Sequence, residues 1–209
     1  MWEYRIVWPG TRPAWWDEAW QRGEVAVKGR GDKVEERPDT YLVISGRTDA
    51  GLKLRDDKDV EIKTLLFREG HWELWEKCPF KKWNSLEVVR FANMLRAGKF
   101  RADTAQSSPL KGVEEFLSRL NLSITRVRVE KRRIQATAAE LLAGTPASNA
   151  DPSWMAEFVE MTLPNKKTLV SLCLETMMPQ RPEIDSLITD GAVVCGYPEL
   201  LARHLNGTL

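Results

Sequence analysis

The sequence has little cysteine and no long apolar run. Its three cysteines, Cys78, Cys173 and Cys195, are far apart and form no CxxC pair, so they indicate neither a disulfide framework nor a zinc site. No apolar stretch approaches the ~18 residues of a membrane-spanning helix, and the first residues lack the basic and apolar regions of a signal peptide. We therefore expect no membrane partner and a cytoplasmic location.

An excess of charge of either sign is also absent. The chain carries 31 lysines and arginines against 30 aspartates and glutamates, which gives a net charge of +1. This balance removes the usual basis for a nucleic-acid coat or a membrane-surface binder, because such proteins present a large excess of positive charge. Any function that depends on charge must therefore come from a local arrangement, and a nucleic-acid partner is not expected.

Several catalytic motifs are missing as well. The sequence contains no P-loop, no Gly-x-Gly-x-x-Gly motif, no Ser/His/Asp set and no catalytic Cys/His pair, so the chemistry built on those motifs loses support. The two histidines, His71 and His204, are expected to pack or to lie at the surface rather than to bind a ligand.

The 209 residues do contain repeated alternation of apolar and charged side chains, which is typical of strands with two unlike faces. We predict a single domain over residues 1–209. The turn chemistry of 164–167 predicts an antiparallel hairpin between the last two strands. The predicted strands are 3–8, 41–45, 51–55, 60–66, 71–77, 123–134, 154–163 and 168–175.

Capping signals predict helices between and after these strands. Asn84 is followed three residues later by Glu87, and Ser108 precedes Pro109 at a first helical position. Apolar residues then recur at helical spacing, so these helices are expected to be amphipathic and to face a core. The predicted helices are 85–97, 109–120, 137–142 and 198–206.

The segment 9–38 differs from the rest of the chain. It holds Trp15, Trp16 and Trp20 and then a charged stretch with glycines. We predict an insertion that forms a short helix followed by a hairpin or loop. In the simpler interpretation the tryptophans cover one end of the core, and in the other they bind a protein partner.

Each predicted strand has one apolar face and one ionic face, as where Leu52 and Leu54 alternate with Lys53 and Arg55. Two arrangements explain this pattern. An antiparallel sheet can leave its ionic face as solvated surface with ion pairs between strands. Alternatively, the sheet closes into a barrel with the helices outside, and the ionic faces line a water-filled interior. Charges in such an interior must be paired, hydrated or bound to a ligand.

The order of the charged residues resembles a known family. They lie on successive strands in the order Glu3-Tyr4-Arg5, Lys53-Leu54-Arg55, Glu61-Ile62-Lys63, Glu73 to Lys77, Arg126 to Arg132, Glu157 to Glu160, and Glu175. This series is similar, along nearly the whole chain, to the CYTH-like, triphosphate tunnel superfamily, which includes inorganic triphosphatases and class IV adenylate cyclases. The resemblance implies an α+β fold: an antiparallel, tunnel-like β-barrel with a charged interior and amphipathic helices packed outside.

The resemblance also implies two sets of site residues. The anion-binding residues would be Arg5, Lys53, Arg55, Lys63, Lys77, Arg126, Arg128 and Arg132. The ligands of Mg²⁺ or Mn²⁺, or the ion-pair partners of those cations, would be Glu3, Glu61, Glu73, Glu130, Glu157 and Glu175. On a regular strand only one of Glu157 and Glu160, and only one of Arg132 and Arg133, can face the interior.

The first strand departs from the Glu-x-Glu-x-Lys pattern of the family, because it has Arg5 for the second acid and Val7 for the lysine. A guanidinium in place of a carboxylate disfavours a metal ion at that point. Two functions therefore stay open. One is binding of a phosphate-rich anion (triphosphate, polyphosphate or nucleotide), with metal-dependent phosphohydrolase activity if the metal site survives. The other is an inactive scaffold that binds a protein partner through the Trp15, Trp16 and Trp20 segment. A barrel that holds RNA 5′ ends is a third hypothesis, which the balanced charge disfavours.

Overall fold

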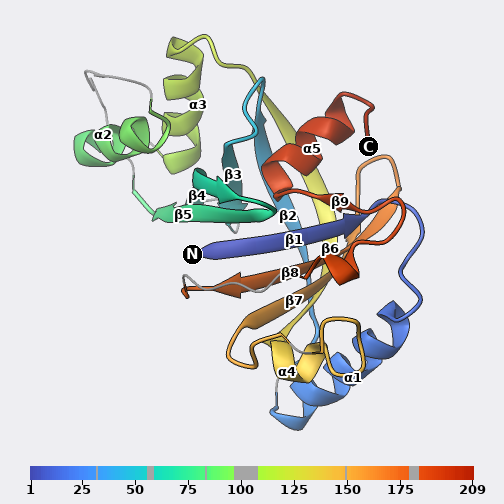
Figure 1. The fold of residues 1–209 in the computed structure, drawn as a ribbon. Coiled ribbons are helices and arrows are strands. Elements are labelled where there is room, and N and C mark those ends of the chain that lie inside the picture. The colour runs from blue at the N-terminus through green and yellow to red at the C-terminus, as the bar shows by residue number, and fades with distance from the viewer. Residues whose placement is uncertain (32, 56–58, 83, 97–107, 149, 179–183) are drawn as a thin grey trace. The chain divides into compact units, whose positions relative to one another are not determined.

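The computed structural model of the protein describes residues 1–31, 33–55, 59–82, 84–96, 108–148, 150–178 and 184–209 (Figure 1). The strands are β1 (Trp2–Trp8), β2 (Glu35–Ile44), β3 (Ala50–Arg55), β4 (Asp59–Glu69), β5 (Trp72–Phe80), β6 (Ile124–Thr137), β7 (Met155–Thr162), β8 (Thr168–Thr176) and β9 (Val193–Val194). The helices are α1 (Trp16–Gly29), α2 (Ser85–Met94), α3 (Pro109–Arg119), α4 (Ala138–Leu141) and α5 (Tyr197–Leu205), with a 3-10 turn at Asp185–Leu187. Within these ranges, none of the helices has the length and apolar character needed to span a membrane.

The strands form one antiparallel sheet in the order β5-β4-β3-β2-β6-β7-β8-β1-β9. The first strand, β1, also pairs with β5, where Trp2 lies opposite Leu74 and Glu3 lies opposite Glu73. Strands β1 to β8 therefore close into a barrel, and β9 pairs outside it with Ile6 and Val7 of β1. The predicted α+β fold with an antiparallel β-barrel is confirmed, and the predicted hairpin joins β7 to β8.

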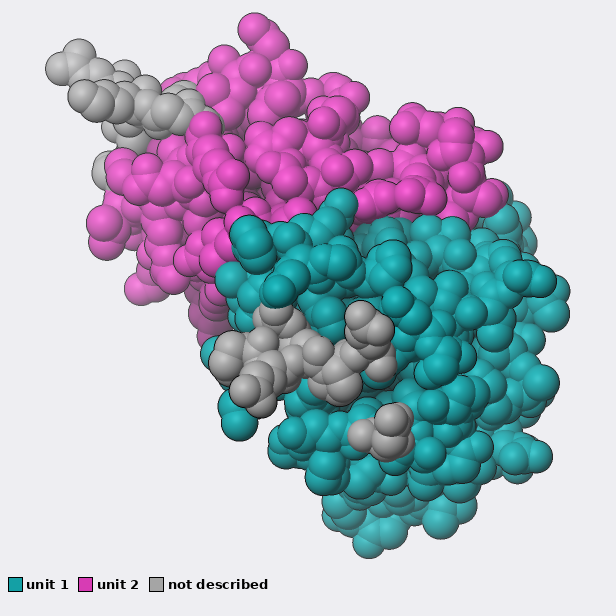
Figure 2. Space-filling model, in the orientation of Figure 1, with its two compact units in different colours: residues 1–38, 67–74, 129–196 teal, residues 39–66, 75–128, 197–209 magenta. Residues whose placement is uncertain are grey.

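The chain folds into two compact units, each built from three separate stretches of sequence (Figure 2). Unit 1 contains residues 1–38, 67–74 and 129–196, and unit 2 contains residues 39–66, 75–128 and 197–209. Four strands, β2, β4, β5 and β6, contribute residues to both units. The single domain over 1–209 stays a prediction.

In unit 1 the core lies between α1 and the apolar faces of β1, β7 and β8. One buried stripe runs along α1, because each of its members has another three or four residues away on the same face: Trp16, Ala19, Trp20, Gly23 and Val27. The helix is 14 residues long, which is longer than the short helix predicted for this segment. The small residues Ala19 and Gly23 weaken the apolar pattern from which a helix length is predicted.

The tryptophans of this segment pack into unit 1. Trp16 is fully buried, and its ring centroid lies 4.9 Å from that of Phe158. Trp20 is buried beside it, and the half-buried Trp15 packs edge-on against Trp8. The three rings cover one end of the core, as the simpler interpretation of the sequence expects.

Gly23 allows α1 to approach α4 and β6 closely. A Cβ atom at this position would lie 2.7 Å from Leu141 Cδ2 and 3.2 Å from Ile134 Cγ2. Gly23→Val should therefore lower the free energy of unfolding by about 1–3 kcal/mol, the usual cost of overpacking a core. Gly29→Val is the matched control, because nothing lies within 4 Å of its Cβ position on the same helix. Urea denaturation measures both variants, and equal losses would contradict the close packing.

In unit 2, α2 and α3 cover one face of β2 to β5. Phe91 on α2 and Phe116 on α3 meet edge to face, with ring centroids 5.3 Å apart. Both helices begin at their predicted caps: Asn84 Oδ1 accepts from the N–H groups of Leu86 and Glu87, and Ser108 Oγ accepts from the N–H of Lys111. The core side chains of the strands include Leu42, Ile44, Leu52, Leu54, Val60 and Ile62. Alternation therefore turns the charged residues of these strands to the opposite face.

Candidate functional site

Unit 1 has a polar face on the side of its sheet away from α1. The apolar residues of β1 pack into the core, so alternation turns Glu3 and Arg5 to the other face. Strand register extends this face: Arg5 lies opposite Cys173 on β8, Cys173 lies opposite Glu157 on β7, and Glu157 lies opposite Gln135 on β6. Arg5, Cys173, Glu157 and Gln135 thus form one row across four neighbouring strands.

Glu157 is the centre of charge on this face. Arg5 Nη1 and Nη2 both donate to Glu157 Oε1 at 3.2 Å, and Arg133 Nη1 donates to Oε2 at 3.0 Å. Arg5 also donates to Ser171 Oγ at 3.4 Å. Burial alone would raise the pKa of Glu157, but the positive charges of Arg5, Lys131 and Arg133 outweigh it and lower the pKa to about 2. The buried carboxylate is therefore ionised at neutral pH.

Two of these cations, Lys131 and Arg133, were not selected from the sequence. Lys131 is 7% exposed, and Arg133 Nε donates to Glu35 Oε2 at 2.7 Å as well as binding Glu157. Burial opposes the charge of Arg133, yet the Glu157 and Glu35 carboxylates outweigh it and raise the pKa above its usual value. The sequence signal for both residues is their position in the strand alternation, because Lys131 and Arg133 lie two and four residues after the buried Val129 and so share its face of β6.

The cations predicted on β6 lie on the other face of the strand. Arg132 lies 5.3 Å from the ring centroid of Trp20 on α1, and it pairs with Glu36 at 3.0 Å and with Glu160 at 2.7 Å. Glu157 and Arg133, rather than Glu160 and Arg132, therefore belong to the polar face. Three further predicted residues lie on the same face of β6 as Arg132, and all three are exposed: Arg126, Arg128 and Glu130. Arg126 pairs with Glu114 of α3.

A group of acids lies on the same face as Arg5, two residues away along β1. Glu3 is opposite Glu175 on β8, and the ligand atoms of Glu3, Cys173 and Glu175 all lie within 4.8 Å of one another. Cys173 Sγ donates to Glu3 Oε2 at 4.0 Å. Burial raises the pKa of the Cys173 thiol well above its usual value, so the sulfur stays protonated and is a poor metal ligand. The two carboxylates are hard oxygen donors of the kind that Mg²⁺ and Mn²⁺ prefer.

Glu73, another predicted acid, lies opposite Glu3 on β5 and is 6% exposed. Its Oε1 accepts from Arg68 Nη2 at 2.5 Å. This carboxylate therefore already has a cationic partner. Among the described residues, the ligand atoms of Glu3 and Glu175 converge together with that of Cys173.

Unit 2 has a polar face of its own, which holds the predicted Lys53 and Lys63. Lys53 pairs with Asp39, which is 3% exposed, and its Nζ lies 5.6 Å from the ring centroid of Tyr41. Lys63 Nζ lies 4.4 Å from the ring centroid of Trp75, which is a close cation–π contact. The remaining predicted residues of this unit are Glu61, opposite Lys53 on β4; Lys77, which is exposed; and Arg55, whose side chain lies outside the described residues.

Helix α5 packs on this polar face of unit 2. A Cβ atom at Gly51 would lie 2.7 Å from Pro198 Cγ, so only glycine allows this approach of helix and strand. The rings of Tyr197 and Tyr41 also meet, with centroids 5.9 Å apart. Because Gly51 and Lys53 share one face of β3, α5 borders the lysine and limits the space beside it.

Comparison with known proteins gives matches in structure alone. No family model and no curated protein sequence matches the chain. A conserved hypothetical protein of Pyrococcus furiosus is similar over 95% of this chain and 99% of its own, with 8% identity and a TM-score of 0.50. A protein of Pyrococcus horikoshii covers 97% of this chain and 99% of its own, with 11% identity and a TM-score of 0.45.

A plant protein is among the further matches. It is a putative adenylyl cyclase of Hippeastrum, described as having a dominant triphosphatase activity, and the match covers 85% of this chain and 80% of that one, with 11% identity and a TM-score of 0.39. At such low identity, the likeness to the Pyrococcus furiosus protein shows a shared fold and does not extend to a ligand or an activity.

Proposed function

We propose that this chain, which has the CYTH-like β-barrel fold, binds a phosphate-rich anion such as tripolyphosphate or a nucleoside triphosphate. The observation that supports this function is the cluster in which the buried Arg5 and Lys131 and the partly exposed Arg133 surround the carboxylate of Glu157. Buried cations favour an anionic ligand because it neutralises charge that water does not reach. Guanidinium groups also make two-point contacts to phosphate.

A divalent cation fits beside this cluster. Glu3 and Glu175 would hold Mg²⁺ or Mn²⁺ through their carboxylate oxygens, and the bound ion would polarise a phosphoryl group. Arg5 binds Glu157 and so removes one carboxylate from the metal ligands that the resemblance implies. We therefore expect a smaller metal site than the sequence resemblance implies.

Hydrolysis would require a group that orients or activates water. Glu157 is a weak base, because its pKa is about 2 and both of its oxygens accept hydrogen bonds from arginines. Anion binding is therefore the primary proposal, and metal-dependent release of phosphate is a second result that the same experiment can detect.

Tripolyphosphate should raise the unfolding temperature of the protein. A ligand at about 100 times its Kd stabilises the native state by about 2.7 kcal/mol, which corresponds to a shift of about 5–10 °C for a chain of this size. Lys131→Met should reduce that shift by about half or more, measured from the unfolding temperature of the variant alone. Lys111→Ala is the control, because this lysine is 71% exposed on α3.

The same titration with Mg²⁺ and with ATP tests the metal and the nucleotide. A larger shift in the presence of Mg²⁺ that disappears in Glu175→Gln would support the Glu3 and Glu175 site, and phosphate release would identify an enzyme. If no anion shifts the unfolding temperature, the ligand-binding proposal is overturned.

A scaffold that binds a protein partner is the alternative function. The observation in its favour is that cations of both polar faces already have carboxylate partners, as in the pairs of Arg5 with Glu157 and of Lys53 with Asp39. Such a protein would give no shift with tripolyphosphate and no response to Mg²⁺. The thermal titration therefore separates the two functions.

A further inference from the structure

The polar face of unit 1 changes from charged to apolar along its strands. On β1, Val7 lies two residues beyond Arg5 and therefore on the same face. On β7, Val159 lies two residues beyond Glu157, again on the same face. Both valines lie opposite Ser171 of β8. They therefore begin a second row of the face, next to the row that holds the charges.

This second part of the face is fully buried. Beyond the valines, Met161 of β7 lies opposite Leu169 of β8 and opposite Lys131 of β6. None of these apolar side chains belongs to the core that α1 covers, since they lie on the other side of the sheet. We call the group the apolar layer, and each of its five members is at most 1% exposed: Val7, Val129, Val159, Met161 and Leu169.

The polar side chains at the apolar layer interact with the charged row. Ser171 Oγ accepts from Arg5 at 3.4 Å, and the positive charge of Lys131 lowers the pKa of Glu157. The layer itself presents hydrocarbon. It therefore closes the polar face at this end to any ligand that must keep its charges hydrated or paired.

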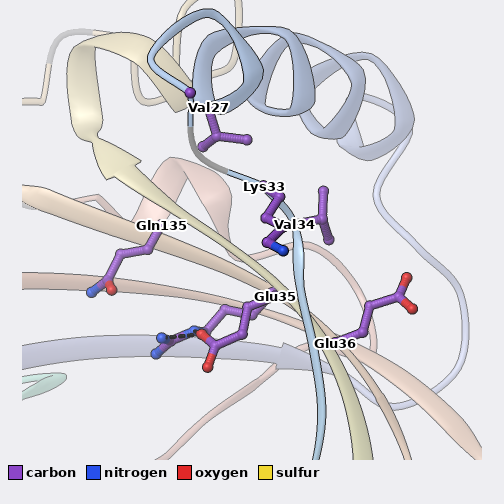
Figure 3. Close-up of a pocket in the computed structure, with 8 residues that line it drawn as sticks. Val27, Lys33, Val34, Glu35, Glu36 and Gln135 are labelled. Carbon is purple, nitrogen blue, oxygen red and sulfur yellow. Dashed lines mark hydrogen bonds and ion pairs between the residues drawn. The ribbon is translucent and has the colours of Figure 1, made fainter.

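The other end of the face is open. A cavity of about 680 Å³ lies there, and Arg133 and Gln135 of β6 are part of its lining (Figure 3). Along β6 the order from the apolar layer to the cavity is Val129, Lys131, Arg133 and Gln135. Charged residues from the range 33–36 also line the cavity, so it suits a hydrated ionic ligand. Its volume is in the range of small-molecule sites.

We propose that the polar face of unit 1 binds only the end of a linear polyphosphate chain. The terminal phosphate would lie against the charged row, next to the apolar layer, and the rest of the chain would leave through the cavity. An internal stretch of the chain would have to continue through the apolar layer, where its negative charges would lose water without gaining partners. The inference rests on the proposed binding of a phosphate-rich anion and adds which part of that anion is bound.

A terminal phosphate also suits the charged row better than an internal phosphate does. It presents three oxygens and carries up to two negative charges near neutral pH, whereas an internal phosphate has two free oxygens and one charge. Guanidinium groups such as those of Arg5 and Arg133 make two-point contacts to such oxygens. The end of the chain is therefore the part that these arginines recognise.

Calorimetric titration with linear polyphosphates of two lengths, one about twice the other, tests the inference at about pH 7.5. Each chain has two ends and is therefore a divalent ligand. We expect two protein molecules per chain at both lengths. A number of bound proteins that rises in proportion to the length would overturn end recognition, because it would show that internal stretches are bound.

Two ligands without free ends complete the test. Trimetaphosphate is a ring of three phosphates, and we expect its Kd to be at least about tenfold above that of tripolyphosphate. A long chain whose two terminal phosphates are coupled to an amine keeps nearly all of its charge, and we expect it not to bind. Capped and uncapped chains of equal affinity would overturn the inference.

A pair of variants shows whether short and long chains use the same site. Arg133→Gln should raise the Kd of tripolyphosphate and of the long chains by the same factor, about tenfold. Arg12→Gln is the matched control, because Arg12 is 43% exposed and pairs with Glu160, which does not belong to the polar face; its Kd values should equal those of the wild type. A loss confined to tripolyphosphate would place the long chains elsewhere and overturn the inference.

The outcomes separate this inference from the proposed function. If tripolyphosphate does not bind, the proposed function fails. If tripolyphosphate binds but the number of proteins per long chain grows with its length, the proposed function stands and end recognition alone is overturned.

Discussion

Arg5→Leu should lower the free energy of unfolding by about 3 kcal/mol, because it leaves the buried Glu157 carboxylate without its strongest cationic partner. Both terminal nitrogens of Arg5 donate to Glu157 Oε1 at 3.2 Å, and its side chain is only 5% exposed. Leucine fills part of the space but offers no charge. Urea denaturation followed by tryptophan fluorescence measures the loss.

Arg12→Leu is the matched control for this prediction. Arg12 pairs with Glu160 at 2.8 Å and with Asp17 at 3.1 Å, but its side chain is 43% exposed. Exposed ion pairs contribute less than about 1 kcal/mol. A loss in Arg5→Leu as small as that in Arg12→Leu would show that Glu157 is hydrated in solution, and it would remove the buried cluster that supports anion binding.

Acid should destabilise the protein through the same carboxylate. The pKa of Glu157 falls from its ordinary value of 4.5 to about 2 in the folded protein, so the folded state holds the ionised form more strongly than the unfolded chain does. The resulting stabilisation, about 3 kcal/mol, is fully present above the unfolded pKa and is lost as the pH falls from about 5 towards 2. The free energy of unfolding, measured by urea at a series of pH values, should decline across that window.

Glu157→Gln isolates this contribution. The variant keeps the shape of the side chain but has no group that titrates, so its stability should decline less than that of the wild type between pH values of about 5 and 3. The variant should also be less stable than the wild type at neutral pH, since Arg5, Lys131 and Arg133 lose their shared anion. Parallel pH profiles of the two proteins would show that other carboxylates govern acid unfolding.

Local chemistry explains which parts of the fold were predictable. Alternation is regular along β3 and along the first half of β4, residues 59–64, because one face of each packs on α2 and α3 and the other carries charge. The caps at Asn84 and Ser108 and the capping box of Thr137 with Glu140 depend on residues three apart. All of these are short-range signals, and the structure has each of them in place.

Where both faces of a strand carry charge, alternation alone does not choose between them. In β6, arginines lie on both faces of the strand. Arg132 faces Trp20 of α1 and Glu36 of β2, whereas Arg133 faces Glu157 of β7, so the neighbouring elements decide which arginine joins the polar face. The start of β2 at Glu35 was missed for a similar reason, because its first residues are charged and include Pro38. The predicted strand began at residue 41, six residues late.

The pairing that forms the centre of the candidate site was also beyond a local pattern. Arg5 and Glu157 are separated by 152 positions and meet because β8 pairs with β1 on one side and with β7 on the other. The sequence offers six glutamates as partners of the predicted cations: Glu3, Glu61, Glu73, Glu130, Glu157 and Glu175. Only the register of the sheet distinguishes among them.

The contact of Pro198 with Gly51 also concerns the order in which the protein is made on the ribosome. The strand β3 is synthesised about 140 residues before α5, which at about 5–20 residues per second is a delay on the order of ten seconds. During that time α5 has not yet been made, so the surface of β3 at Gly51 that this helix later covers stays exposed in the nascent chain. The helix that covers Gly51 is complete only after translation has passed residue 205, and a ribosome that stalls earlier would leave that strand open to chaperones or to other nascent chains.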